Sequence, residues 1–221
     1  MRLAVDKLKI EGLHRAVGGD LGGDWCSVWS IDDEVFFVIG DAPGHGRAAA
    51  MSVPTLREML RAAVSQSTGS PADALRAANL VACRTSCESF SALIAAYRPS
   101  TASLTVAAAG HPAPIVARHD FAVALPVDGV LLGVDADAQY HDVELPLCGG
   151  DRVLLYTDGL IEANKTPTEG EKMLVEQFSR NVSARRMMDD LVPPDPVDDV
   201  GLLRLEYATC TPSERAADAS G

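Results

Sequence analysis

The chain has 221 residues, 47% of them hydrophobic and 23% charged, which is typical of a globular protein with one domain. Its formal net charge of −12 argues against a nucleic-acid partner, because phosphate backbones are bound by basic surfaces. No apolar run approaches the ~20 residues of a membrane span, and charges interrupt the N-terminal stretch, so we expect neither membrane insertion nor a signal peptide.

The five cysteines are odd in number, scattered, and without a Cys-x-x-Cys pair. They are Cys26, Cys83, Cys87, Cys148 and Cys210. This pattern favours reduced thiols in a cytoplasmic protein over a disulfide framework.

The first third of the chain predicts three strands and then a helix. The strands are expected at 3–10, 25–31 and 34–40, and the third is so continuously apolar that both of its faces should be buried. Apolar residues at helical spacing indicate a helix that ends near Ser67. Pro54 lies inside this stretch, so the helix either begins at Pro54 or is kinked there.

A second helix has a clear start signal. Ser70 is suited to the N-cap, Pro71 to the first helical position and Asp73 to the first turn. This helix is expected to end near Thr85.

The rest of the chain predicts strands and then helices. Strands are expected at 90–98, 102–109, 113–118, 121–125, 140–145, 152–157 and 200–207, and helices at 169–180 and 184–191. Runs of strands separated by helices indicate an α+β fold with antiparallel sheets flanked by helices. We expect a single domain over residues 1–207 and a disordered, small and polar tail over residues 208–221.

Acidic residues stand where several predicted strands meet turns. Asp24 precedes a strand, Asp41 and Asp158 follow strands, and the pair Asp198 and Asp199 precedes the last strand. Hard divalent cations prefer carboxylate oxygens, and strand ends hold such ligands rigidly. Two cations about 3.5–4 Å apart can neutralise a phosphate ester and activate a water molecule. The acids therefore predict a two-metal hydrolase.

Five motifs follow one another in the chain. They are Gly-Gly-Asp at 22–24, Gly-Asp-x-x-Gly-His-Gly at 40–46, Ala-Gly-His-x-x-Pro at 109–114, Gly-Asp-Arg-x-Leu-Leu-Tyr-Thr-Asp-Gly-x-x-Glu at 150–162 and Asp-Asp-Val-x-Leu-Leu at 198–203. In this order the motifs resemble the SpoIIE-type branch of the PPM (PP2C-like) metal-dependent serine/threonine protein phosphatases. The resemblance covers residues 20–207.

The resemblance implies a PP2C-like sandwich of two antiparallel sheets flanked by helices, with two Mn²⁺ or Mg²⁺ ions at one edge. Asp41 would bridge both ions, Asp158 and Asp198 would bind one of them, and Asp24 would bind the other. The backbone carbonyl of Ala42 would be a further ligand. Asp41 and Asp158 would therefore be the catalytic residues.

The chain departs from the family pattern in several places. Gly201 stands where the family has a threonine, which is expected to loosen the support of Asp198. The third motif lacks both of its usual asparagines. The long helix that usually precedes the domain is absent, and the helical region between Glu162 and Asp198 is short.

Several residues invite competing interpretations. Asp20, in a second Gly-Gly-Asp, competes with Asp24, which we favour because it directly adjoins a strand. Asp199 is expected to be a solvated neighbour of Asp198. His45 fits a loop or cap role better than that of a general acid.

Three further residues have a structural alternative to a functional role. His111 is expected to serve loop backbone groups, and Cys26 to be a small buried residue, since Mn²⁺ and Mg²⁺ prefer oxygen. Arg47 suits either contact with a substrate phosphate or a solvated charge.

The resemblance implies a phosphatase for phosphoserine or phosphothreonine. The usual substrate in the family is a STAS-domain anti-sigma-factor antagonist, whose dephosphorylation lets it capture an anti-sigma kinase in bacterial stress signalling. The alternatives are a pseudophosphatase that binds a partner without turnover and an unrelated metal-binding protein. The four aspartates favour the enzyme, whereas Gly201 favours the pseudophosphatase.

Overall fold

The computed structural model describes residues 1–17, 22–44, 46–67, 69–85, 87–163 and 166–208. Its strands are β1 (Arg2–Val5), β2 (Leu8–Arg15), β3 (Asp24–Ile31), β4 (Glu34–Asp41), β5 (Ser91–Arg98), β6 (Ser103–Ala109), β7 (Ile115–Arg118), β8 (Phe121–Ala124), β9 (Val143–Pro146), β10 (Arg152–Tyr156) and β11 (Val200–Tyr207). Its α-helices are α1 (Gly46–Gln66), α2 (Pro71–Arg84), α3 (Gly159–Glu162), α4 (Pro167–Ser179) and α5 (Ala184–Leu191), and a short 3-10 helix covers Pro99–Thr101.

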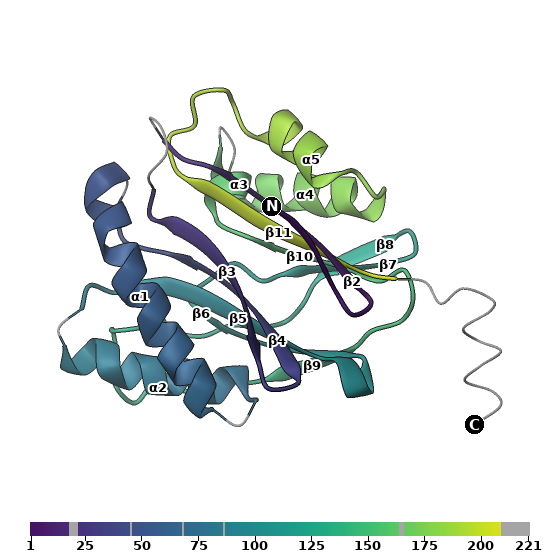
Figure 1. The fold of residues 1–221 in the computed structure, drawn as a ribbon. Helices are drawn as coiled ribbons and strands as arrows, with labels where there is room; N and C mark the ends of the chain where they lie inside the picture. The colour runs from purple at the N-terminus through teal and green to yellow at the C-terminus, as the bar shows by residue number, and fades with distance from the viewer. Residues whose placement is uncertain (18–21, 45, 68, 86, 164–165, 209–221) are drawn as a thin grey trace.

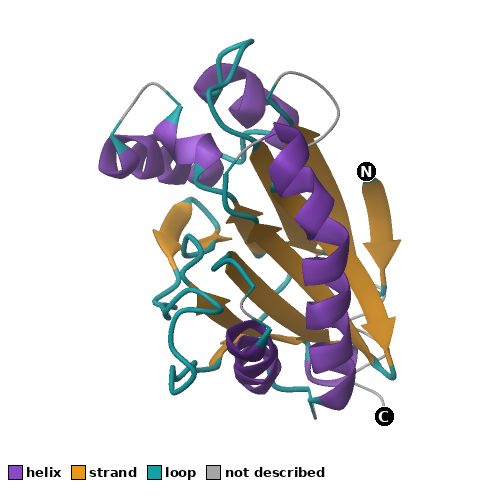
Figure 2. Cartoon of the chain, turned by 90° about the vertical axis from the view of Figure 1, so that its left-hand side faces the viewer, coloured by secondary structure: helices purple, strands orange, loops and turns teal. Residues whose placement is uncertain are grey.

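The strands form two antiparallel sheets that face each other (Figure 1). The first sheet has the order β1-β2-β11-β10-β7-β8, and the second has the order β3-β4-β5-β6-β9. Helices α1 and α2 cover the outer face of the second sheet, and α3, α4 and α5 cover that of the first (Figures 1 and 2). The predicted α+β sandwich of two antiparallel sheets flanked by helices is therefore confirmed.

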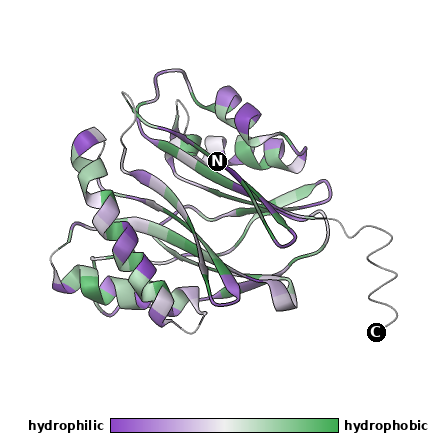
Figure 3. Ribbon diagram, viewed as in Figure 1, coloured by the Kyte–Doolittle hydropathy of each residue, from purple (hydrophilic) through white to green (hydrophobic). Residues whose placement is uncertain are grey.

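Three layers of apolar side chains hold the sandwich together. Phe37 and Ile39 of β4 point into the layer between the sheets, whereas Phe36 and Val38 point into the layer beneath α1 and α2. This alternation confirms that β4 is buried on both faces. A third layer lies beneath α3, α4 and α5. The helices show apolar and polar stretches in alternation along their length, as expected of helices that pack on one side (Figure 3).

Several predicted boundaries need correction. The expected strand at 3–10 is two strands, because the chain turns at Asp6, whose φ is 51°. Helix α1 begins eight residues before Pro54 and continues through it, so the start at Pro54 is wrong. Helix α3 was not anticipated. The Ser70 cap of α2 is confirmed, because the Ser70 side chain accepts a hydrogen bond from the Asp73 amide.

Some expectations fall outside the described residues. These are the roles of Asp20 and His45 and all of the predicted tail except Ala208, whose amide donates to the Lys7 carbonyl. Among the helices that the structure describes, none has both the length and the apolar character needed to cross a membrane.

Candidate active site

The second sheet brings two of the predicted acids side by side. Asp24 is the first residue of β3, Asp41 is the last residue of β4, and the two are directly opposite in the antiparallel register. Opposite residues project from the same face, with Cβ atoms about 4.5–5.5 Å apart. Asp41 stands two residues beyond Ile39, which points into the layer between the sheets. Both carboxylates therefore project toward the first sheet.

The first sheet brings the other two acids to the same end of the sandwich. Asp158 follows the end of β10, and Asp198 precedes β11, which is the antiparallel neighbour of β10. The end of one strand and the start of the next lie at the same edge of an antiparallel pair. Burial raises the pKa of Asp41, and the charges of Asp158 and Asp198 across the gap between the sheets raise it further.

A buried hydroxyl connects the two pairs. Thr157, the residue before Asp158, donates a hydrogen bond of 2.6 Å from its Oγ1 to Oδ2 of Asp24. The same Oγ1 accepts a hydrogen bond of 2.8 Å from the Gly201 amide, and the Thr157 amide donates to the Gly201 carbonyl at 3.0 Å. Thr157 therefore fixes the position of Asp24 relative to β10 and β11. The sequence analysis missed it, although its place directly before Asp158 was a signal.

Asp199 is not a solvated neighbour, which corrects our expectation. It is only 2% exposed, and its carboxylate accepts hydrogen bonds from the amides of Val17 at 2.7 Å and Gly23 at 2.6 Å. A side chain at Gly22 would begin 2.3 Å from the Asp199 carboxylate, so this approach requires glycine. Asp199 therefore holds the turn that carries Asp24.

Burial and the charges of neighbouring aspartates raise the pKa values of Asp24, Asp41 and Asp158. Burial, followed by the charges of neighbouring aspartates, raises the pKa of Asp24 to about 9, although the Thr157 hydrogen bond opposes the change. Burial and the charges of Asp158 and Asp198 raise the pKa of Asp41 to about 7. Burial and Asp198 also raise the pKa of Asp158. Asp24, Asp41 and Asp158 thus form one electrostatically coupled group, and the charge of Asp198 acts on Asp41 and Asp158.

The donor set suits hard divalent cations, because the grouped side chains offer carboxylate oxygens. However, no three His, Cys, Asp or Glu side chains in the described part of the chain stand close enough together to hold a metal ion. The acids therefore fit the chemistry of a metal site, while their side chains are not gathered around a common point. The carbonyl of Ala42, the predicted fifth ligand, belongs to a buried residue whose amide donates to the Gly23 carbonyl at 3.1 Å.

The structure also describes three other candidate residues. Cys26 packs against the layer between the sheets, and burial raises the pKa of its thiol to about 12, so it stays neutral at physiological pH. Arg47 is exposed in the first turn of α1, which agrees with either interpretation. The ring of His111 binds the side chain of Ser91 at 2.7 Å, a partner that the sequence analysis did not anticipate.

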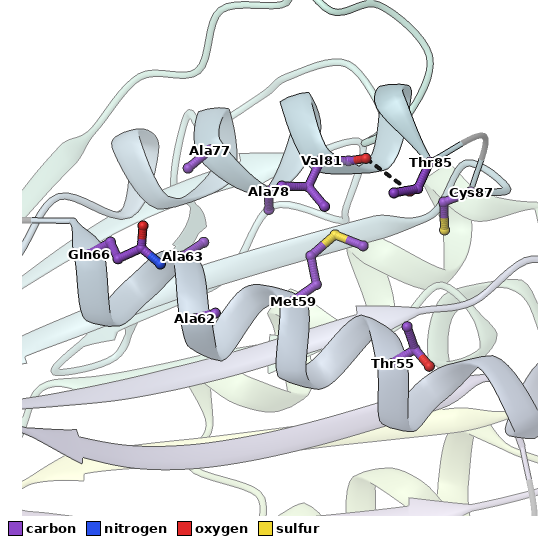
Figure 4. Close-up of a pocket in the computed structure, with 10 residues that line it drawn as sticks. All are labelled: Thr55, Met59, Ala62, Ala63, Gln66, Ala77, Ala78, Val81, Thr85 and Cys87. Carbon is purple, nitrogen blue, oxygen red and sulfur yellow. Dashed lines mark hydrogen bonds between the residues drawn. The ribbon is translucent and has the colours of Figure 1, made fainter.

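A large apolar cavity lies away from the acids. It has a volume of about 550 Å³ and is lined by residues of α1 and α2 together with Thr85 and Cys87 (Figure 4). None of the four acids lines it.

Two facing antiparallel sheets flanked by helices, with four acids at one end, are the architecture of the PP2C-like phosphatase domains that this chain resembles in structure. The family model described as Stage II sporulation protein E (SpoIIE) matches residues 31–207, which include Asp41, Asp158 and Asp198 but not Asp24. The chain belongs to the SpoIIE family, whose members are serine/threonine protein phosphatases that use divalent metal ions.

Solved structures share this fold. The RsbU and RsbW domains of a Mycobacterium tuberculosis protein are 25% identical to this chain, with a TM-score of 0.79 over 93% of it. This chain spans 61% of that structure's length. The phosphatase domain of SpoIIE from Bacillus subtilis has a TM-score of 0.80 at 15% identity, covering 93% of this chain and 63% of that one. RsbX, solved with magnesium, has a TM-score of 0.71 at 14% identity. The match covers 94% of this chain and 99% of RsbX.

Proposed function

We propose that this protein is a metal-dependent phosphatase for phosphoserine or phosphothreonine in a protein substrate. The observation that carries the proposal is the placement of Asp24, Asp41, Asp158 and Asp198 at one end of the sandwich, where burial and the charges of neighbouring aspartates raise the pKa values of Asp24, Asp41 and Asp158. Such mutual repulsion is relieved by bound cations.

The proposed site holds two Mn²⁺ or Mg²⁺ ions. Asp41 would serve both ions, Asp158 and Asp198 would hold one of them, and Asp24 with the Ala42 carbonyl would complete the set. Bound divalent cations neutralise a phosphate ester and lower the pKa of water. The chain's own contribution is to hold its oxygens in place: Thr157 fixes Asp24, and β4 fixes Asp41.

The proposed substrate is a phosphorylated STAS-domain protein, the antagonist of an anti-sigma kinase in a partner-switching stress pathway. The support is the family and the likeness to RsbU and RsbW domains. A cytoplasmic location belongs to the proposal, supported by the four described cysteines, which are all free.

A pseudophosphatase is the second candidate. One observation favours it: among the described residues, the acids do not form a group able to hold a metal ion. In that case the protein would bind its phosphorylated partner without hydrolysing the phosphate ester.

Asp158→Asn separates the two candidates. The substitution keeps the shape of the side chain and removes one carboxylate ligand, so an enzyme should lose turnover by a factor of about 100 or more. Binding of the phosphorylated partner should persist. The measurement is phosphate release from a phosphoserine STAS protein, alongside binding by calorimetry, for wild type and variant. A wild type that binds without any phosphate release, just as the variant does, identifies the pseudophosphatase.

A further inference from the structure

His111 and Ser91 form a buried pair that the proposed mechanism does not use. Nδ1 of His111 lies 2.7 Å from Oγ of Ser91, and the two residues are 6% and 9% exposed. They come from different parts of the second sheet: Ser91 begins β5, and His111 follows Gly110, which bridges to Ala92. A buried side-chain hydrogen bond of this length fixes the orientation of both groups.

The pair stands next to the proposed metal site. Ser91 is directly opposite Asp41 in the register between β4 and β5, just as Asp24 is opposite Asp41 on the other side. Asp24, Asp41 and Ser91 therefore form a row across three strands, all projecting from one face. With Cβ atoms about 4.5–5.5 Å apart, the Ser91 hydroxyl is within reach of the Asp41 carboxylate.

The protonation of His111 decides where the hydroxyl proton of Ser91 points. Burial lowers the pKa of His111 to about 3, so the ring is neutral and carries one N–H. The polar backbone group that acts on the ring is that of Tyr156, on β10, although Nε2 has no partner with ordinary hydrogen-bond geometry in the described residues. A carbonyl beside the ring favours the Nε2–H tautomer. Nδ1 then accepts, and the Ser91 hydroxyl donates to it.

We propose that His111 is a positioning residue that keeps the Ser91 hydroxyl directed away from Asp41, so that both oxygens of the Asp41 carboxylate remain available to a divalent cation. The inference rests on the proposed metal-dependent function and adds to it a residue that controls the proposed bridging ligand. Without an acceptor at position 111, the hydroxyl would turn and donate to Asp41 instead. Asp24 keeps Oδ1 free beside its Thr157 bond to Oδ2, whereas Asp41, as the proposed ligand of both ions, would need both of its oxygens, so a hydroxyl bond to either would compete with a cation.

A set of variants at the two positions tests this inference. His111→Leu fills the space of the ring but offers no acceptor, and should lower the affinity for Mn²⁺ about tenfold or more, as loss of a group that orients a metal ligand commonly does. Ser91→Ala removes the hydroxyl and should leave the affinity within about twofold of wild type. The double variant should regain most of the affinity. His111→Asn, whose Oδ1 can accept from Ser91, should also keep most of it.

The measurement is titration of metal-free protein with Mn²⁺, followed by the EPR signal of the free ion, after thermal melting has shown that each variant is folded. His141→Ala, at an exposed histidine, is the matched control. Recovery in the double variant is the decisive result, because a merely structural role for His111 would make the two substitutions additive or worse.

Unchanged affinity in His111→Leu, or no recovery in the double variant, overturns the proposal. If His111→Leu does not fold, His111→Ala takes its place, and failure of both to fold identifies a purely structural residue. Failure of the proposed function is seen separately, as a wild type that neither binds Mn²⁺ nor releases phosphate.

Discussion

Thr157 occupies the point where the two sheets approach the candidate site. Its hydroxyl donates to Asp24 on the second sheet and accepts from the Gly201 amide on the first. A Cβ atom at Gly201 would lie 3.6 Å from Cγ2 of Thr157 and 3.7 Å from Sγ of Cys26, which is ordinary contact. The backbone of Gly201 thus supports Thr157, while the expected loosening of Asp198 stays a prediction.

Thr157→Val should destabilise the protein. The substitution keeps the shape of a fully buried side chain but leaves the Gly201 amide without its acceptor and Asp24 without its donor. We expect the free energy of unfolding to fall by about 1–3 kcal/mol, measured by urea denaturation without metal. Thr157→Ser, which retains the hydroxyl, should lose less. Equal losses in the two variants would show that the methyl group, rather than the hydrogen bonds, matters here.

Individual side-chain directions are what the sequence predicted least well. Asp198 and Asp199 are adjacent and chemically identical, and the carboxylate of Asp199 proved to be the one that holds the loop before β3. Consecutive residues at a strand start project to opposite sides, so a shift of one residue exchanges their roles. Ser91 was missed for a related reason, since only the register of β4 with β5 brings it beside Asp41.

At the scale of elements, local signals in the sequence succeeded where they were strong. The N-cap of α2 and the apolar run of β4 were predicted from residue type and period alone. The division between β1 and β2 was missed because Asp6 adopts a positive φ without the glycine that usually marks such turns. Helix α3 is four residues long, too short to show a helical period.

The α2 cap offers a test at this scale. Ser70 accepts from the Asp73 amide at 3.1 Å and donates to Asp142, which in turn accepts from the Ala72 amide. Ser70→Ala should therefore lower the free energy of unfolding by about 1–2 kcal/mol, measured by denaturant titration. Ser65→Ala, at an exposed position of α1, is the matched control and should change stability by less than about 0.5 kcal/mol. Similar effects in both variants would exclude a specific capping role.

For the whole molecule, the coupled acids predict an unusual dependence of stability on pH. An unfolded aspartate has a pKa of about 3.9. In the folded protein the pKa values of Asp24 and Asp41 are raised to about 9 and about 7. Between these limits the folded state holds protons that the unfolded state has released, so these groups reduce stability progressively as pH rises from about 4 to about 9.

Asp41→Asn isolates this effect. In metal-free buffer the melting temperature of the variant, relative to wild type, should increase as pH rises from 4 to 8, because the neutral amide places no charge in a buried position and no longer repels Asp158 and Asp198. With saturating Mn²⁺ the wild type should instead have the higher melting temperature, since only wild type gains the full stabilisation by metal binding. Parallel melting curves at every pH would argue that Asp41 has no charged neighbours of consequence.

The central claim is that phosphate hydrolysis here depends on cations held by carboxylates. Its most direct test is p-nitrophenyl phosphate hydrolysis by purified protein in excess EDTA and again after addition of Mn²⁺ or Mg²⁺. The account predicts no measurable turnover in chelator and recovery on addition of either ion. Full turnover in EDTA would contradict it.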